Sequence, residues 1–283
     1  MYTGKTKNLG VIGYPIAHSL SPVLQNAALS EAGLDYAYVA LPVQPEQLPA
    51  AVEGIRALAF RGVNVTIPHK TAIMPLLDEI DEDAQIIGAV NTVVNDDGHL
   101  KGYNTDVIGF MDALLEKGFE PEGKTAALLG AGGAARAVIW GLIKHGTSRI
   151  CIGVRNPAKV QALVEYFRPY ARLELFHWTD KKFQQVLLHA DLLINTTPLG
   201  MYPKVEAAPP VDWQYVPAAA FVYDIIYTPE KTRFLQQAEE NGNTILNGEH
   251  MLAGQGAAAF QLWTGQKADL GTMTQALREA LRS

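Results

Sequence analysis

A glycine-rich turn near the middle of the chain has the residue types of a dinucleotide-binding site. It follows the apolar segment 125–129, it opens a segment with helical spacing, and it fits the pattern G-x-G-x-x-G/A. The glycines permit a tight turn and a close approach of backbone to a pyrophosphate, which the free N–H groups of the helix would bind. The alternative is a strand-to-helix turn without a ligand. The predicted cofactor-binding residues of this turn are Gly130, Ala131, Gly132, Gly133, Ala134 and Ala135.

The residues about 20 positions further on indicate which dinucleotide would bind. Proteins that bind NAD usually carry an acidic residue there for the ribose 2′-hydroxyl, but the segment 153–159 contains none. Arg155 is placed instead to meet a 2′-phosphate, and Lys159 adds positive charge. We therefore predict NADP as the cofactor and include the neighbouring Asn156 in its site. The alternative is that Arg155 is only a solvated residue at the end of a strand.

A lysine and an aspartate, distant in the sequence, are candidates for acid-base chemistry. The segment 63–70 places Asn64 and Thr66 on one face of a predicted strand. It ends with Lys70 just beyond the carboxyl end of that strand, where α/β sheets bind ligands. A lysine that meets a carboxylate such as Asp106 can relay a proton, because each group holds the protonation state of the other. The sequence does not show that these two residues meet.

Alternating strand-like and helix-like segments predict the elements that must position these residues. β-branched runs at 10–12, 37–41 and 63–67 are interleaved with segments of helical spacing, which predicts parallel β-α-β units and a sheet with helices on both faces. Residues 88–106 instead show alternating apolar residues around Asp97-Gly98, a pattern that predicts a hairpin.

The same alternation resumes at residue 125, and only helical patterns follow residue 248. At roughly 150 residues per domain, 283 residues predict about two domains. The predicted fold class is therefore α/β, with a Rossmann-like NADP-binding domain over 107–247. A discontinuous substrate-binding and catalytic domain would span 1–106 and 248–283. We expect the ligands to bind in a cleft between the two domains.

Composition excludes several classes of protein. The chain is 48% hydrophobic and 18% charged, which is typical of a well-buried α/β protein. With 23 basic and 29 acidic residues the net charge is −6, so no overall field attracts nucleic acid. No apolar stretch reaches the roughly 18 residues of a membrane span. A single cysteine, Cys151, excludes an internal disulfide and a multi-cysteine metal site, which points to a reducing compartment and a cytoplasmic protein. We also predict no metal site.

Taken together, these motifs resemble the shikimate dehydrogenases, the family that reduces 3-dehydroshikimate to shikimate in the aromatic amino acid pathway. Eight segments match in the order of the family and cover nearly the whole chain. They are GYPIAHSLSP (13–22), NVTIPHK (64–70), GAVNTV (88–93), GYNTD (102–106), GAGGAARA (130–137), NTTPLGM (195–201), YDIIYTPEKTRFL (223–235) and GEHMLAGQGAAAFQLWTG (248–265).

The resemblance implies a role for each matched residue. Lys70 and Asp106 match the catalytic pair, in which the lysine exchanges a proton with the C3 oxygen and the aspartate holds the substrate and the ammonium. The other residues implied around the substrate are Ser19, Ser21 and Tyr227 at its carboxylate, and Asn64 or Thr66, Asn91, Asp106 and Gln255 at its ring hydroxyls. Ser19 and Ser21 could alternatively cap the helix that we predict to begin at Pro22.

The resemblance also extends the cofactor site, and it has departures. The further cofactor-binding residues that it implies are Thr196, Ile225, Gly248 and Met251. Gln25 stands where the family usually has histidine, and His250 stands where a small or apolar residue is common. Val154 and Asn156 replace the usual polar neighbours of the arginine at the 2′ end, which predicts a weaker preference for NADP than is typical.

Two other functions remain open at this stage. One is an NAD-dependent quinate/shikimate dehydrogenase, which would differ mainly at Arg155. The other is a non-catalytic, nucleotide-binding regulatory member of the family, against which the intact Lys70, Asp106, Asn91 and Gln255 count. The predicted partner is a small-molecule substrate, shikimate or 3-dehydroshikimate, with no nucleic acid and no membrane. We expect a monomer or a homodimer.

Overall fold

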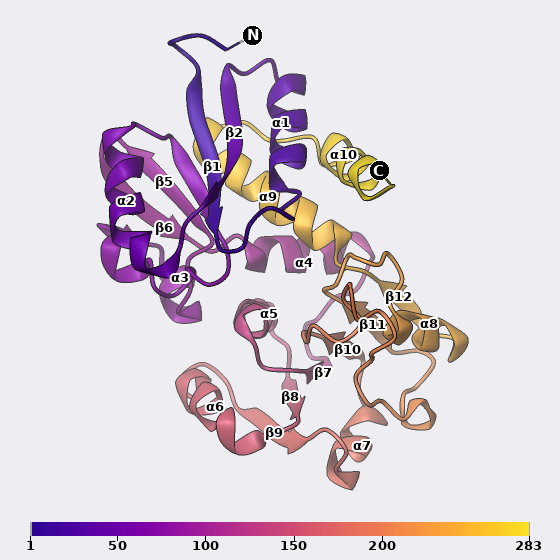
Figure 1. Cartoon of the computed structure of the whole chain (residues 1–283). Helices are drawn as coiled ribbons and strands as arrows, with labels where there is room; N and C mark the ends of the chain where they lie inside the picture. The colour runs from indigo at the N-terminus through magenta and orange to yellow at the C-terminus, as the bar shows by residue number, and fades with distance from the viewer. Residues whose placement is uncertain (1, 283) are drawn as a thin grey trace. The chain divides into compact units, whose positions relative to one another are not determined.

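The computed structural model describes residues 2–282, and its chain divides into two compact units (Figure 1). The first comprises Met1–Gly109 with Ala253–Ser283, and the second is Phe110–Leu252. Both divisions fall inside helices, α4 (Asp106–Glu116) and α9 (Glu249–Thr264). Each unit is built around its own six-stranded sheet.

The first unit contains a mixed sheet in the order β2-β1-β3-β5-β6-β4. Its first three neighbouring strands are parallel, whereas β5 runs antiparallel to β3 and to β6. The strands are β1 (Lys7–Gly13), β2 (Tyr36–Pro42), β3 (Gly62–Val65), β4 (Glu79–Ile80), β5 (Thr92–Asp96) and β6 (His99–Tyr103). The hairpin predicted at Asp97-Gly98 is confirmed, because both residues have positive φ, 50° and 93°, as a type I′ turn requires.

Among the described residues, four α-helices lie entirely within the first unit: α1 (Ser21–Glu31), α2 (Leu48–Ala57), α3 (Glu82–Ile87) and α10 (Leu270–Arg282). The C-terminal helix α10, yellow in Figure 1, packs beside α1. Apolar residues of the sheet and of α2, such as Ile12, Val63, Val93 and Ile55, form one buried cluster. This packing fixes the sheet whose strand ends carry the candidate residues.

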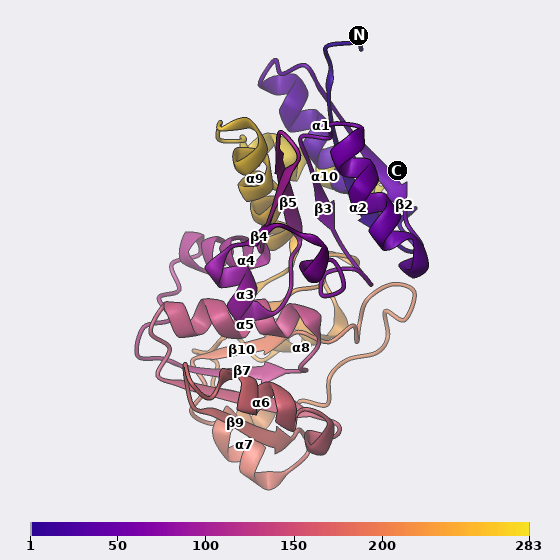
Figure 2. The ribbon, with the colours of Figure 1, turned by 90° about the vertical axis from the view of Figure 1, so that its left-hand side faces the viewer.

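The second unit contains an all-parallel sheet in the order β12-β11-β10-β7-β8-β9. Figure 2 shows helix α5 above β7 and β10. The strands are β7 (Thr125–Leu129), β8 (Arg149–Val154), β9 (Leu173–His177), β10 (Leu192–Asn195), β11 (Phe221–Asp224) and β12 (Thr244–Leu246), and the helices are α5 (Gly133–Lys144), α6 (Gln161–Phe167), α7 (Lys181–Leu187) and α8 (Arg233–Glu240). The strand order reverses between β7 and β10, and open α/β sheets bind ligands beside such a reversal.

The structure confirms the α/β fold class that the alternating segments predict. One irregular segment joins β8 to α6, a short 3-10 turn at Pro157–Lys159. Proline fixes the start of that turn, and Asn156 precedes it without a side-chain cap. Strand β11 ends at Asp224, and residues 225–227 continue as a loop. Within residues 2–282, no helix is long and apolar enough to cross a membrane.

Candidate active site

Lys70 and Asp106 meet in the structure. The Lys70 ammonium donates to Asp106 Oδ2 at 2.6 Å, and both side chains are partly buried. Lys70 follows β3, and its carbonyl accepts from Val90 N–H at 2.8 Å. Asp106 is the first residue of α4, and its N–H donates to Asn104 Oδ1 at 3.1 Å. Two different elements therefore place an ammonium and a carboxylate in direct contact, as proton relay requires.

Asn91 holds the other oxygen of this carboxylate. Its amide nitrogen donates to Asp106 Oδ1 at 2.8 Å and to Thr105 Oγ1 at 3.1 Å. Its amide oxygen accepts from Thr105 N–H at 2.8 Å and from Thr92 Oγ1 at 3.0 Å. Asn91 is buried, so these bonds are protected from competition with water. The amide fixes the direction in which the Asp106 carboxylate points.

The Asn64 side chain is committed to bonds inside the protein. Its amide nitrogen donates to Asn91 O at 3.2 Å and to Thr92 Oγ1 at 3.0 Å, and its oxygen accepts from Tyr38 O–H at 2.7 Å. Both amide hydrogens are used, which leaves one acceptor position. Thr66, two residues further along the chain, is only half-buried. Of the two alternatives for the ring hydroxyls, the geometry therefore favours the Thr66 hydroxyl.

Tyr38 is a residue of this network that the sequence analysis missed. Burial raises the pKa of Tyr38, while the nearby Ser21 hydroxyl opposes that rise. A neutral phenol is therefore the donor to Asn64. Tyr38 lies in the run 37–41 that the sequence predicts as a strand, and nothing local in the sequence connects it with Asn64.

Ser19 and Ser21 lie at the N-terminus of α1, and both are half-buried. The cap residue is Leu20, and no side chain caps the helix. The hydroxyl of Ser19 only accepts from Ser21 N–H at 3.3 Å. The first turn of α1 contains no acidic residue, so the positive end of the helix dipole is available to an anion. The capping interpretation of these serines is therefore not what the structure shows.

Gln25 connects two helices of the first unit. Its Nε2 donates to Gly256 O in α9 at 2.9 Å, and its buried Oε1 has no partner among residues 2–282. Gln255, one of the residues expected to contact the substrate, is half-buried on α9. The departure at position 25 therefore has a structural role in joining α1 to α9.

The remaining predicted substrate and nicotinamide residues belong to the second unit. Tyr227 is half-buried, and burial raises the pKa of its phenol, so the hydroxyl is a neutral donor. A Cβ on Gly248 would come within 2.0 Å of Ile225 O, so only glycine fits this contact. Gly248 N–H also donates to Ile226 O at 2.9 Å. Met251 is buried in the first turn of α9.

The turn between β7 and α5 has the geometry expected for phosphate binding. Gly130 has φ +103°, and a Cβ there would lie 2.7 Å from Thr197 Cγ2. Apart from the adjacent residues and the backbone of the helix itself, no atom of residues 2–282 lies within 4 Å of a Cβ built on Gly132 or Gly133, so this side of the turn is open. Gly132 precedes α5 without a side-chain cap, and the first turn of α5 is free of acidic residues. The turn can therefore present backbone N–H groups to an anion.

Thr196 supports this turn from the neighbouring strand. Its hydroxyl and its N–H both donate to Leu129 O, at 3.0 and 2.9 Å. A Cβ on Gly130 would lie 3.0 Å from the Thr196 hydroxyl. The geometry thus assigns Thr196 to holding the glycine turn at the reversal of the strand order.

Arg155 follows β8 and is exposed. Its guanidinium lies over the Trp178 ring, 6.0 Å from the centroid, and it forms no ion pair with any residue that the structure describes. Asn156 and Lys159, also exposed, lie in and beside the adjacent 3-10 turn. The segment 155–159 that follows β8 therefore carries two cations and no carboxylate, which fits a 2′-phosphate.

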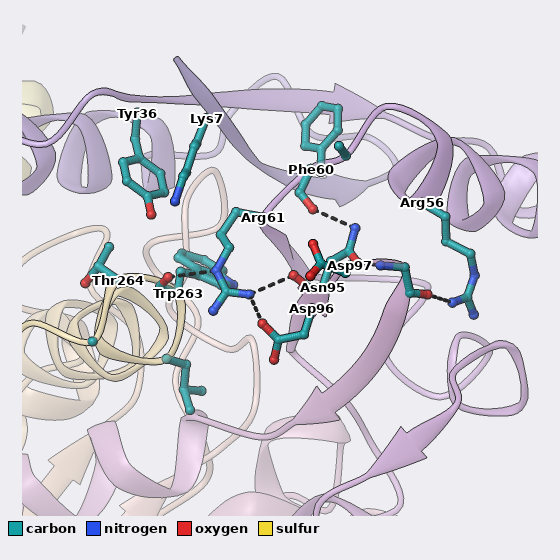
Figure 3. Close-up of a pocket in the computed structure, with 14 residues that line it drawn as sticks. Lys7, Tyr36, Arg56, Phe60, Arg61, Asn95, Asp96, Asp97, Trp263 and Thr264 are labelled. Atoms are coloured by element: carbon teal, nitrogen blue, oxygen red, sulfur yellow. Dashed lines mark hydrogen bonds and ion pairs between the residues drawn. The ribbon is translucent and has the colours of Figure 1, made fainter. Parts of the chain in front are cut away.

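A separate pocket of about 760 Å³ opens at the opposite ends of the first unit's strands (Figure 3). Lys7 and Tyr36 begin β1 and β2 beside it. Arg61, which precedes β3, donates to Trp263 O at 2.9 Å and to Asn95 O at 2.7 Å. None of the predicted site residues lines this pocket. Over residues 2–282, no group of three or more His, Cys, Asp or Glu side chains comes together as a metal site.

Comparison with known protein families gives three matches along the chain. The Shikimate dehydrogenase substrate binding domain matches residues 11–93, and the Shikimate 5′-dehydrogenase C-terminal domain matches residues 248–278. Between them, residues 125–214 match the family described as NADP oxidoreductase coenzyme F420-dependent.

Individual proteins match over nearly the full length. Shikimate dehydrogenase (NADP⁺) of Moorella thermoacetica is 45% identical over 276 residues, which covers 96% of this chain and 93% of that protein. A crystal structure of a shikimate dehydrogenase in complex with NADP⁺ is 40% identical, with a TM-score of 0.91 over 99% of this chain and 98% of that one. Shikimate 5-dehydrogenase from Listeria monocytogenes, in complex with shikimate and NAD, is 38% identical, with a TM-score of 0.93 over 98% of each chain. The chain belongs to the shikimate dehydrogenase family.

Proposed function

We propose that this protein is an NADP-dependent shikimate dehydrogenase, which catalyses the reversible reduction of 3-dehydroshikimate to shikimate. The observation that carries the proposal is the 2.6 Å contact between Lys70 and Asp106, with Asn91 on the second carboxylate oxygen. Full-length relatives named for this activity support it. A non-catalytic nucleotide-binding protein would have no need to keep this pair in contact.

Lys70 is the proposed acid-base group. NADPH, when bound, supplies the hydride that reduces the C3 carbonyl. In that direction the Lys70 ammonium donates a proton to the C3 oxygen, and in the reverse direction the neutral amine accepts it. Asp106 accepts a hydrogen bond from Lys70 and, in the proposed complex, one from a substrate hydroxyl. Asn91 keeps the carboxylate oriented toward both.

Recognition of the substrate is assigned to hydroxyl and amide groups. The carboxylate would bind the hydroxyls of Ser19, Ser21 and Tyr227, beside the uncapped N-terminus of α1. The ring hydroxyls would bind Thr66 and Gln255, while Asn64 and Asn91 act mainly on protein neighbours. Each such bond contributes about 0.5 to 1.5 kcal/mol net.

The proposed NADP site lies in the second unit. The open turn at Gly132 and Gly133 would bind the pyrophosphate, and Arg155 with Lys159 and Asn156 would bind the 2′-phosphate. The turn residues Gly130, Ala131, Ala134 and Ala135 shape this surface, with Thr196 behind it. The residues proposed around the nicotinamide are Ile225, Gly248 and Met251.

We propose the corresponding division of labour for the two parts of the chain. Residues 1–106 and 248–283 would supply the acid-base pair and most of the substrate contacts, and residues 107–247 would supply most of the contacts to NADP. The Lys70–Asp106 contact in one unit and the glycine turn in the other support this assignment.

The absorbance change of the nicotinamide during turnover tests the function. Purified protein is mixed with shikimate or quinate and with NADP⁺ or NAD⁺, and the initial rates of the four mixtures are compared. We expect the highest kcat/KM with shikimate and NADP⁺. A higher value with NAD⁺ would favour the quinate/shikimate dehydrogenase alternative, since the similar quinate dehydrogenase from Corynebacterium glutamicum has a structure in complex with NAD. No reduction in any mixture would favour the non-catalytic alternative.

We also propose that the protein acts in the cytoplasm as a monomer or a homodimer. The only cysteine, Cys151, is buried, and burial raises its pKa to about 11, which keeps the thiol protonated. One cysteine forms no internal disulfide, so the fold does not require an oxidising compartment. Fractionation of cells tests the location, and light scattering of the purified protein tests the oligomeric state.

A further inference from the structure

Asp224 is a fully buried carboxylate that neither the proposed proton transfer nor the proposed cofactor contacts use. It ends β11 and accepts three hydrogen bonds. Asn195 Nδ2 and Ile226 N–H donate to its Oδ1 at 3.0 and 3.1 Å, and Thr232 Oγ1 donates to its Oδ2 at 2.7 Å. Burial raises the pKa of Asp224 to about 6.

The three donors belong to three different segments. Asn195 ends the neighbouring strand β10, and its side-chain oxygen accepts from Thr197 N–H at 2.9 Å, so it orders the turn after that strand. Ile226 lies in the loop that follows β11. Thr232 is the N-cap of α8, where its hydroxyl also accepts from Leu235 N–H at 3.3 Å. One carboxylate therefore joins a strand end, a loop and a helix start.

Burial of the Asp224 carboxylate lowers the free energy of unfolding relative to an apolar residue that fills the same space, so stability alone does not explain it. Its three bonded partners are neutral groups, so no opposite charge among them offsets the loss of hydration. An apolar residue would fill the same space without that cost, but it would leave three buried donors unpaired. The carboxylate thus specifies one conformation of the chain around it.

The conformation that it specifies is the bend at Ile225 and Ile226. Ile225 N–H donates to Asn195 O at 3.2 Å, and Ile226 O accepts from Gly248 N–H at 2.9 Å. Tyr227 follows directly. The bend therefore lies between the side chain of Asp224 and the backbone of Gly248. It contains Ile225, which is proposed to lie near the nicotinamide, and it precedes Tyr227, which is proposed to bind the substrate.

We propose that Asp224 is a positioning residue: its carboxylate fixes the bend at Ile225 and Ile226, and so sets where the Ile225 side chain and the Tyr227 hydroxyl lie. The proposal rests on the proposed function for the roles of Ile225 at the nicotinamide and Tyr227 at the substrate. It does not depend on that function for the claim that the carboxylate orders the loop.

Two substitutions separate the hydrogen bonds of Asp224 from its charge. In Asp224→Asn the amide oxygen still accepts from Asn195 and Ile226, and the amide nitrogen can donate to the Thr232 hydroxyl. In Asp224→Ala all three bonds are lost. Asp180→Ala is the matched control, since Asp180 is an exposed N-cap aspartate in the same unit, on α7, that accepts from Lys182 N–H at 2.9 Å.

Steady-state kinetics and ligand binding give the first measurement. We expect Asp224→Ala to lower kcat/KM for shikimate by about 100-fold, through a higher KM and a lower kcat, since a small displacement of positioning groups costs about this much. The affinity for 2′,5′-ADP, which probes only the Arg155 end of the site, should stay the same. Asp224→Asn and Asp180→Ala should both behave like the unsubstituted protein.

Amide hydrogen exchange gives the second measurement and does not depend on activity. We expect the peptide that contains residues 225–232 to exchange faster in Asp224→Ala, and at the original rate in Asp224→Asn and Asp180→Ala. An unchanged rate in folded Asp224→Ala would overturn the proposal whatever reaction the protein catalyses. An Asp224→Asn protein as impaired as Asp224→Ala would also overturn it, because the charge and not the bonding would then matter.

Thr232 provides the test if Asp224→Ala does not fold. Thr232→Val removes the hydroxyl that donates to Asp224, and Thr232→Ser keeps it. We expect faster exchange over 225–232 and a raised shikimate KM in Thr232→Val alone. Equal behaviour of the two variants would overturn the proposal. If the unsubstituted protein does not oxidise shikimate, the proposed function fails, and the exchange rates still decide the role of Asp224.

Discussion

The Asp106 carboxylate is oriented before any ligand binds. Asn91 donates to one oxygen and Lys70 to the other, and the oxygen of the Asn91 amide is itself held by Thr105 N–H. Such preorganised contacts avoid reorganisation during proton transfer. The position of the Lys70 amine is therefore set by a chain of bonds that starts deep in the first unit, at Tyr38 and Asn64.

Loss of the Lys70 amine should slow the chemical step. We expect Lys70→Ala to lower kcat by about 10² to 10⁴, the usual range for a general acid-base group, with a much smaller change in KM. Steady-state kinetics on folded protein measures both constants. Lys101→Ala is the control, because Lys101 also pairs with a carboxylate, Glu79, on the sheet of the same unit. A raised KM with kcat intact would make Lys70 a binding residue instead.

Arg155 should decide the choice between NADP and NAD. A charge-assisted contact with the 2′-phosphate contributes about 1.5 to 3 kcal/mol, which corresponds to a preference of roughly 10- to 150-fold in kcat/KM. We expect Arg155→Ala to remove most of it by raising KM for NADP⁺, while activity with NAD⁺ stays the same. Added salt should weaken the binding of NADP⁺ more than that of NAD⁺, because Arg155 is exposed.

The control for Arg155 is Arg168→Ala, which removes an exposed arginine of the same unit that pairs with Glu165. Cofactor preference should not change in this variant. Equal damage to both cofactors in Arg155→Ala would show that Arg155 does not contact the 2′-phosphate.

At the scale of elements, the N-terminus of α1 combines two hydroxyls with the positive end of a helix dipole. We expect the double variant Ser19→Ala with Ser21→Ala to weaken shikimate binding about tenfold or more, through the loss of hydrogen bonds to a carboxylate. NADP⁺ binding should not change. Calorimetry with each ligand separately measures the two affinities.

Ser30→Ala, in the last turn of the same helix, is the matched control because Ser30 is exposed and far along α1 from the N-terminus. It should leave both affinities unchanged. An equal loss of both ligands in the double variant would mean that the change damaged the fold instead of the carboxylate site.

At the scale of the whole molecule, Asp224 should make stability depend on pH. The folded protein keeps the Asp224 proton up to about pH 6, whereas the unfolded chain releases it near pH 3.8. The folded state therefore binds more protons between these values, and this contribution to stability is lost as the pH rises through that window. The shift corresponds to about 3 kcal/mol.

Asp224→Asn cannot ionise, so it should not share this loss. We expect the difference in unfolding free energy between the variant and the unsubstituted protein to move in favour of the variant by about 3 kcal/mol between about pH 3 and about pH 7. Denaturant unfolding at a series of pH values measures it. A difference that does not change with pH would mean that Asp224 keeps an ordinary pKa.

Several features of this protein follow from the sequence by itself. The open turn at 130–135 and the hairpin at Asp97-Gly98 are local, because a few consecutive residues determine the backbone that glycine permits. The α/β class follows from the alternation of apolar periods, which each segment carries independently. The family follows from eight motifs in order, together with the full-length match to relatives.

The pairing of side chains across the fold was decided only by the tertiary structure. Lys70 and Asp106 lie 36 positions apart in the sequence. They meet because the fold brings the segment after the carboxyl end of β3 next to the first residue of α4. The sequence did not reveal that Asn64 donates both amide hydrogens to groups of the protein, or that Asp224 accepts three hydrogen bonds. The physical reason is that these bonds depend on the order and register of strands, which no local pattern encodes.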